Sequence, residues 1–290
     1  MIPARLKTAA TLAIILLVFG FAGVVHAEES APELYDLETR LEVRNVGDKA
    51  SKYVRVRLPL LSTDGSHGEV IEESYNLEPE EIREEDGVRI GVFYIRNLAP
   101  GASFTLKVRY TVDRSVREAV DEEWVNLEQP KVAADAPEII RTANSVTDGL
   151  QDREEKVAAL LDFTHNHITY DRESPHRNTG ALSALNNRAG VCEDYATLFV
   201  SLARAAGIES RTVYGYYYSD SRAIWERHAW AQYRDSDGEW TSADPTFSTR
   251  TDVDSEGLYI AQWYNDRSVK MGFVGGKIGA EMNTTVAAAR

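Results

Sequence analysis

Cysteine is almost absent from this sequence, because Cys192 is the single cysteine in 290 residues. A lone cysteine forms no internal disulfide, so we expect packing alone to stabilise the folded chain. Positive charge is also scarce: 32 lysines and arginines stand against 46 aspartates and glutamates, which gives a net charge of −14. No basic patch suited to a phosphate backbone remains, and we therefore expect no nucleic-acid partner.

The N-terminus carries Arg5 and Lys7 and then runs without a charge from Thr8 to Ala27. A short basic start followed by an apolar run predicts that residues 1–27 are a secretory signal peptide. An uncleaved membrane anchor is the alternative, since the run approaches the ~18–20 residues that a spanning helix needs. In both cases we expect the working domains to be secreted or to lie in the cell envelope, outside the cytoplasm.

Residues 33–115 alternate between apolar and polar side chains, as strands with one buried face do. Turn signals such as Asn45-Val-Gly47 and Pro100-Gly101 separate the alternating runs. Several such strands in a row predict an all-β sandwich of immunoglobulin-like type. No cluster of histidines or carboxylates here indicates chemistry, so we expect a role in spacing, docking or substrate presentation. The alternating side chains include Leu37, Leu41, Val43, Val54, Val56, Leu58, Val88, Ile90, Val92, Leu106 and Val108.

After a connector at 116–134, residues 135–290 are predicted to form a second domain of the α+β class. Pro137 favours a helix start, and Asp148-Gly149 ends that helix. A second helix is expected from about Asp152. The tail offers two more short strands, around 269–274 and 278–286, which we assign to this second domain.

A third helix is predicted to begin at Cys192, after a turn that contains Gly190. Its apolar side chains recur at the 3.6-residue period, and Gly207 suits a left-handed cap at its end. A helix N-terminus stabilises an anion, so a thiol held there is suited to form the reactive thiolate. The apolar stripe consists of Tyr195, Leu198, Phe199 and Leu202.

A nucleophilic cysteine needs a histidine nearby in space and a group that orients the histidine. His228 and Asp244 are the candidates, each in a strand-like context downstream. Each residue also has a purely structural interpretation. Cys192 could be an inert buried thiol, His228 a core histidine, and Asp244 the cap of a turn fixed by Pro245.

Together these residues resemble the transglutaminase-like superfamily of papain-related cysteine enzymes. The resemblance rests on Gly190-Val-Cys192-Glu-Asp194-Tyr195-Ala196, Arg204-Ala-Ala-Gly207-Ile208, Arg211, Gly215, His228-Ala-Trp230, and Trp240 with Asp244-Pro-Thr. It implies a papain-like core with a catalytic triad of Cys192, His228 and Asp244. It also implies an acyl-thioester intermediate on a protein or peptide substrate. One departure is Gln232, where many relatives carry glutamate, and we expect this change to tune substrate contacts.

Several alternatives remain open at this stage. The chain could be a catalytically silent module that binds a cell-envelope partner, or a metalloprotein that uses Cys192 and His228. His165 and His167 form a weak metal motif, because a spacing of two on a helix makes the side chains diverge. No cofactor is expected. The sequence leaves open water or an amine as the acyl acceptor, the second oxyanion donor, and the oligomeric state.

Overall fold

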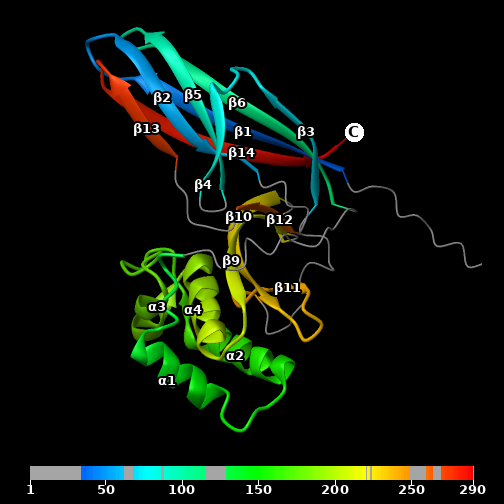
Figure 1. The fold of residues 1–290 in the computed structure, drawn as a ribbon. Coiled ribbons are helices and arrows are strands. Elements are labelled where there is room, and N and C mark those ends of the chain that lie inside the picture. Colours follow the sequence, from blue (N-terminus) through cyan, green and yellow to red (C-terminus); the bar gives the residue numbers. More distant parts are fainter. Residues whose placement is uncertain are drawn as a thin grey trace, which may run out of the picture. The chain divides into compact units, whose positions relative to one another are not determined.

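The structure is a computed structural model of the chain (Figure 1). It describes residues 34–61, 68–85, 88–114, 129–219, 221–222, 224–247, 259–263 and 269–289. The predicted signal peptide and most of the predicted connector lie outside these residues. Within the described ranges, no helix combines the length and apolar character needed to cross a membrane.

Two four-stranded antiparallel sheets form what we call the two-sheet region. The strand orders are β14-β1-β6-β3 and β13-β2-β5-β4 (Figure 1). The first sheet consists of β1 (Leu34–Asn45), β3 (Glu69–Tyr75), β6 (Ser103–Asp113) and β14 (Ile278–Ala288). The second consists of β2 (Ser51–Pro59), β4 (Glu81–Glu85), β5 (Val88–Leu98) and β13 (Lys270–Val274).

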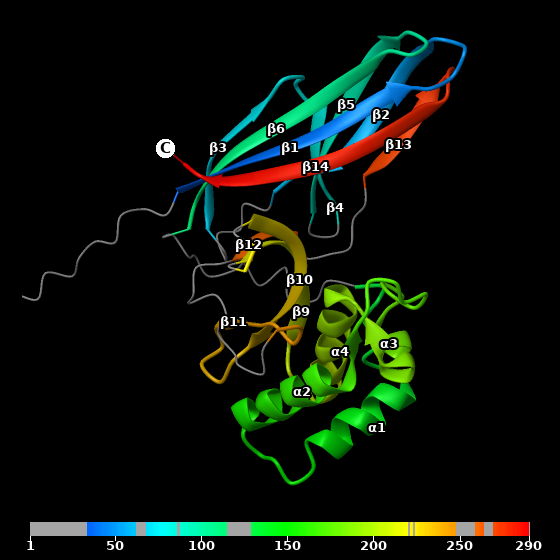
Figure 2. The same cartoon turned by 180° about the vertical axis from the view of Figure 1, so that it is seen from behind.

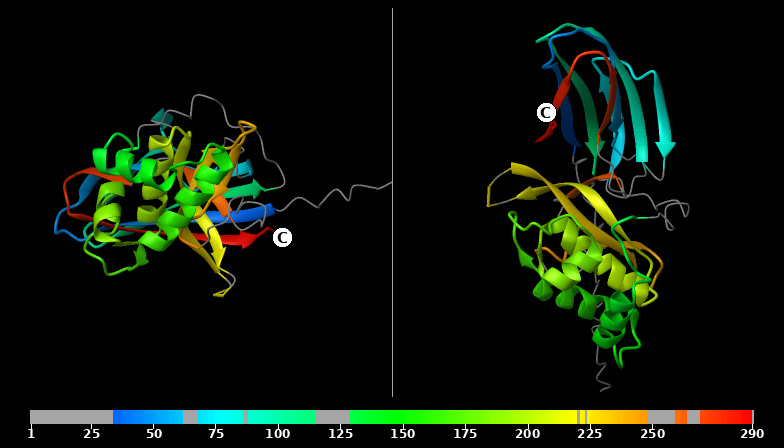
Figure 3. Two further views of the ribbon diagram at one scale, coloured as in Figure 1. Left: turned by 90° about the horizontal axis from the view of Figure 1, so that it is seen from below. Right: turned by 90° about the vertical axis from the view of Figure 1, so that its left-hand side faces the viewer.

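The two sheets face each other (Figure 3, right). Buried side chains from both sheets contribute to one hydrophobic core. Along β1 every second side chain from Leu37 to Val43 is buried, as the alternation in the sequence predicts. The predicted β-sandwich agrees with this shared core, while its immunoglobulin-like type stays a prediction. The short strands β3 and β4 were not expected, because their side chains are mostly exposed and give no apolar alternation.

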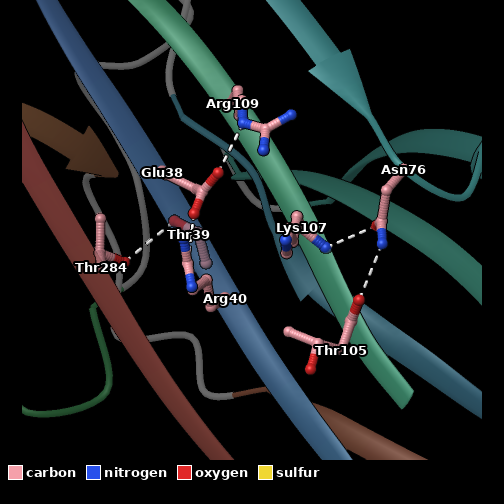
Figure 4. Close-up of polar contacts among 8 residues, drawn as sticks. All are labelled: Glu38, Thr39, Arg40, Asn76, Thr105, Lys107, Arg109 and Thr284. Atoms are coloured by element: carbon pink, nitrogen blue, oxygen red, sulfur yellow. Dashed lines mark hydrogen bonds and ion pairs between the residues drawn. The ribbon is translucent and has the colours of Figure 1, made fainter.

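Polar side chains tie neighbouring strands of the first sheet together (Figure 4). The hydroxyls of Thr39 on β1 and Thr284 on β14 are 2.9 Å apart. The carboxylate of Glu38 accepts from Arg109 on β6 at 2.5 Å. The side-chain amide of Asn76 donates to the carbonyl of Thr105 at 2.8 Å and accepts from the backbone N–H of Lys107 at 2.7 Å.

The last two strands do not join the second domain, so the boundary expected for residues 135–290 was wrong at its C-terminal end. β14 pairs with β1, with Met282 opposite Leu41, and β13 pairs with β2, with Met271 opposite Val56. The alternating pattern identified the strands themselves. The pattern did not identify the neighbouring strands. Alternation of apolar and polar residues indicates which face of a strand is buried, but it does not indicate which other strand pairs with it.

The remaining elements form a helical cluster against a third sheet of order β11-β10-β9-β12 (Figure 2). Helix α4 (Cys192–Ala205) packs on β9 and β10 and contacts the other three helices. Its predicted stripe is buried, and Gly207 has the left-handed φ of +79°. The other elements are α1 (Pro137–Val146), α2 (Arg153–His167), α3 (Ala181–Asn187), β7 (Thr169–Tyr170), β8 (Ala189–Gly190), β9 (Ser210–Ser219), β10 (Ile224–Arg234), β11 (Trp240–Ala243) and β12 (Tyr259–Trp263).

The predicted starts of the first two helices are confirmed. Pro137 opens α1, and the Asp152 carboxylate caps α2 by accepting from the N–H of Glu155 at 3.0 Å. The short helix α3 and the strand β12 were missed. Each is shorter than the window over which a periodic pattern becomes visible.

Asn45 closes the end of the two-sheet region and generates a test of stability. Its fully buried amide donates to the carbonyls of Lys49 and Leu98 and accepts from the N–H groups of Gly47 and Lys277. We expect Asn45→Ala to lower the free energy of unfolding by about 2–4 kcal/mol, because buried backbone groups lose their partners. Urea unfolding measures it. The control Asn76→Ala, at an exposed site, should cost about 1 kcal/mol, and equal losses would contradict the prediction.

Candidate active site

Cys192 is the first residue of α4, and the turn before it is shaped by Asp194. The buried carboxylate of Asp194 accepts from the N–H of Val191 and the N–H of Asn178, both at 2.9 Å. A Cβ on Gly190 would lie 2.4 Å from this carboxylate, so the turn requires glycine there. Asp194 therefore caps the helix and holds the thiol at the helix N-terminus.

A short parallel pair of strands fixes the cysteine turn from the other side. Tyr170 on β7 lies opposite Gly190 on β8, and the Tyr195 hydroxyl donates to the carbonyl of Ile168 at 2.6 Å. Tyr170 is 42% exposed, and the Arg172 guanidinium lies 5.9 Å from the centre of its ring. The pKa of Arg172 lies above its usual range because of Tyr170, with smaller contributions from Glu226 and Cys192. An exposed cation thus lies over the ring of Tyr170, next to the cysteine turn.

His228 and Asp244 form a buried hydrogen-bonded pair. His228 lies on β10 and Asp244 directly follows β11, and these strands pair with Ala231 opposite Ala243. The Nε2 atom of His228 is 2.6 Å from Oδ2 of Asp244, and neither side chain is more than 3% exposed. The Cys192 side chain lies near enough to the imidazole to contribute to the raised pKa of His228. Since Asp244 engages Nε2, Nδ1 is the ring nitrogen left for the thiol.

The electrostatics of this pair follow from burial and contact. Burial by itself lowers the pKa of His228, but the charge and hydrogen bond of Asp244, assisted by Cys192, raise it to about 10. Burial by itself raises the pKa of Asp244, but His228 and Tyr259 lower it below its usual value. The imidazolium and the carboxylate are therefore the stable forms across the neutral range.

Aromatic rings surround the imidazole. Phe247 stacks on His228 with centroids 4.9 Å apart, Tyr217 lies at 4.8 Å, and Trp230 lies at 6.3 Å. Trp230 is fully buried, as expected of a core residue, whereas Phe247 is 51% exposed. The imidazole thus has an apolar surround, and the outermost of its rings, that of Phe247, is half exposed.

Two groups near Asp244 were not predicted as parts of the site. The Tyr259 hydroxyl donates to Oδ2 of Asp244 at 2.8 Å, and Nδ1 of His165 is 2.9 Å from the carbonyl oxygen of Pro245. Their positions, 15 residues after and 79 before Asp244, follow from tertiary pairing alone. No sequence motif could have identified them.

The two histidines of the weak metal motif serve separate backbone contacts. His165 bonds to Pro245, while Nε2 of His167 lies 2.7 Å from the carbonyl oxygen of Leu185. The ring of His167 also stacks on Phe163 at 4.7 Å. Across the described part of the chain, no three His, Cys, Asp or Glu side chains gather in a group that could hold a metal ion.

The expectation that Gln232 tunes substrate contacts was wrong. Its side chain is buried, and its Oε1 accepts from Nε and Nη2 of Arg211 at 2.9 and 2.7 Å. Arg211 is itself fully buried and lies 4.2 Å from the ring centre of Trp240. The side chain at position 232 therefore stabilises a buried arginine on the neighbouring strand and is itself covered by the protein.

Residues 140–245 match the sequence model of the Transglutaminase-like superfamily. The matched segment includes Cys192, His228 and Asp244. The chain therefore carries a transglutaminase-like domain, and the family resemblance predicted from its motifs is confirmed.

Two relatives extend this comparison. The chain is 29% identical over 151 residues to a protein-glutamine gamma-glutamyltransferase of Pseudomonas aeruginosa, an alignment that covers 47% of this chain and 22% of that protein. The fold of the present chain is similar to that of a candidate cysteine protease from Cytophaga hutchinsonii, with a TM-score of 0.62 and 18% identity. The match covers 90% of this chain and 92% of the Cytophaga chain. At this coverage the shared fold includes the two-sheet region, and the α+β class is confirmed.

Gly215 offers a test of how closely the strands must pack around the site. It lies opposite His228 on one side and Ala261 on the other, and a Cβ there would be 2.0 Å from the carbonyl oxygen of Ile260. We expect Gly215→Ala to push β12 away, to cost about 1–3 kcal/mol of stability, and to slow alkylation of Cys192. Thermal unfolding and iodoacetamide labelling measure both effects.

The matched control is Gly272→Ala on β13, where an added Cβ has no neighbour within 4 Å. That variant should keep the labelling rate and gain up to about 1 kcal/mol. Equal changes in stability and in the labelling rate for Gly215→Ala and Gly272→Ala would contradict the close approach of β9 and β12.

Proposed function

We propose that this protein is a thiol enzyme that acts on amide bonds of proteins or envelope peptides through Cys192, His228 and Asp244. The observation that carries the proposal is the buried His228–Asp244 pair, in which Nε2 of His228 is 2.6 Å from Oδ2 of Asp244. The Cys192 thiol lies near enough to the same imidazole to help raise its pKa. A nucleophile, a base in contact with it and an acid that orients the base are the parts that covalent acyl transfer requires.

In the proposed resting state, His228 already holds the proton of the Cys192 thiol as an imidazolium–thiolate pair. In the first step, the thiolate attacks the carbonyl carbon of the substrate amide. Asp244 holds the imidazole in place and supports its positive charge. The N–H of Cys192 has no acceptor within α4, so it is suited to donate to the oxyanion. His228 then returns the proton to the departing amine, the carbon–nitrogen bond breaks, and an acyl-thioester remains on Cys192.

The second step depends on the nucleophile that resolves the thioester. Water yields a carboxylate by hydrolysis, and a primary amine yields a new amide. The Pseudomonas relative is named as a transferase and the Cytophaga relative as a candidate protease, so both outcomes belong to the proposal. The aromatic surround of His228, formed by Tyr217, Phe247 and Trp230, limits access of water and thereby favours an amine that binds there.

We further propose that the enzyme acts outside the cytoplasm, with protein or peptide as its partner. The basic start followed by an uncharged run at residues 8–27 supports this location, since it is typical of an exported chain. The same segment, if retained, would anchor the enzyme to a membrane. The net charge of −14 supports an acidic, soluble surface on the exported protein.

Alkylation of Cys192 by iodoacetamide as a function of pH tests the ion pair. Because His228 stays protonated up to its raised pKa of about 10, the thiolate should form well below the ordinary cysteine pKa of about 8.5 and persist through neutral pH. We expect a fast reactive plateau that begins on the acid side of pH 7.

His228→Ala removes the imidazolium and should return the labelling profile to that of an ordinary thiol. Labelling of the wild type that is slow at neutral pH and rises only near the ordinary cysteine pKa would contradict the proposal. It would favour a silent module that binds an envelope partner.

Turnover of glutamine-containing peptides, with and without an added primary amine, distinguishes hydrolysis from transfer. We expect release of ammonia from such a peptide, and incorporation of the amine if transfer predominates. Cys192→Ala should lower either rate by at least about 10³-fold, since no other thiol is present. A Cys192→Ala variant that retains turnover on the same peptides would rule out the thioester route.

A further inference from the structure

Asp244 is held by more donors than the histidine alone. Its Oδ2 accepts from His228 at 2.6 Å and from the Tyr259 hydroxyl at 2.8 Å, and its Oδ1 accepts from the N–H of Thr246 at 2.9 Å. The χ2 torsion of an aspartate is broad, so rotamer preference does not fix the plane of its carboxylate. The plane is set by these donors, and Tyr259 is the one that shares an oxygen with the imidazole.

Tyr259 is itself rigidly placed. It is 6% exposed, and its ring packs edge-on against Trp230 with centroids 5.1 Å apart. Its strand β12 pairs with β9, where Tyr259 lies opposite Tyr217 and the backbone of Ile260 passes close over Gly215. A phenylalanine would preserve the packing of the ring, so the hydroxyl can be tested apart from the side chain's contribution to the core.

We propose that Tyr259 is a positioning residue for the reaction, a fourth member that fixes the Asp244 carboxylate in the orientation required by His228. The inference rests on the proposed function. Tyr259 does not reach the reacting atoms. It acts indirectly, because its hydroxyl orients Asp244 and Asp244 in turn orients His228. The hydrogen bond from Tyr259 also favours the charged form of Asp244, which lowers the pKa of that carboxyl.

Other charged or titratable groups face this pair and are shared by all variants below. Cys192 from α4 interacts with the imidazole. The ring of Tyr217 from β9 contacts the imidazole ring, and the Tyr217 hydroxyl lies 3.4 Å from the carboxylate of Glu226 on β10. His165 from α2 bonds to the Pro245 carbonyl oxygen rather than to the carboxylate. Because these groups are the same in the wild type and in the variant, a change in the pH profile can be assigned to the removed Tyr259 hydroxyl.

The test is the pH profile of iodoacetamide labelling for the wild type and Tyr259→Phe. Without the hydroxyl, Asp244 loses a donor that favours its charge, so it becomes protonated at a higher pH as the solution is acidified. We expect the acid limb of Cys192 reactivity to move up by about one pH unit. Labelling at pH values below the limb should fall by up to about tenfold, while labelling on the plateau should change little.

Tyr233→Phe is the matched control. Tyr233 is a buried tyrosine on β10 whose hydroxyl donates to another carboxylate, that of Glu154, at 2.9 Å. Its variant should lose a comparable hydrogen bond and some stability, yet keep the acid limb of the wild type. In an Asp244→Asn background, Tyr259→Phe should change the labelling rate less than about twofold, because no carboxylate remains to be oriented.

Thermal unfolding establishes that each variant is folded. If Tyr259→Phe does not fold, 3-fluorotyrosine at position 259 replaces it, since its more acidic phenol donates more strongly and should move the acid limb down. A Tyr259→Phe limb that overlays the wild type, or one that Tyr233→Phe reproduces, overturns the inference while the ion pair stands. The inference is also overturned if Tyr259→Phe lowers the labelling rate as much in the Asp244→Asn background as it does in the wild type. A wild type without neutral-pH reactivity overturns the proposed function and this inference together.

Discussion

A carboxylate without access to water is the constraint on which the site depends. Asp244 is 0% exposed, and an ion in such a position is destabilising unless hydrogen bonds and an opposite charge replace its hydration. The donors come from separate elements: His228 from β10, Tyr259 from β12, and the backbone of the turn at Thr246. The stable burial of one charge therefore requires that these elements meet at fixed distances.

The same requirement couples the helical cluster to the sheet. His165 reaches from α2 to the carbonyl oxygen of Pro245, one residue beyond Asp244. Cys192, at the start of α4, lies near the imidazole that Asp244 engages and helps to raise its pKa. Gly215 on β9 lies between the strand of His228 and the strand of Tyr259, where its missing side chain permits a close backbone approach. The geometry of the site is thus a property of the packed domain.

Local patterns predicted much of this arrangement. The start of α4 at Cys192, the cap at Asp194 and the left-handed Gly207 follow from helix chemistry that is written within a few residues. Cys192, His228 and Asp244 were predicted as the site because each stands in a short motif, and the structure places His228 and Asp244 in contact. Tyr259, His165 and the burial of Gln232 depend on side chains that meet across tens of residues, and such contacts leave no periodicity in the sequence.

The pairing of β14 with β1 has a consequence for how the chain folds. β1 spans residues 34–45 and its partner spans 278–288, so a sheet begun near one end of the chain is completed by the other. Contacts this distant in sequence bear a large loop-closure entropy and form slowly. During synthesis, the whole transglutaminase-like domain emerges before the first sheet can be closed. Early folding therefore leaves an open strand edge on β1 until residues 278–288 have been made, and this edge is a site for misassembly until they arrive.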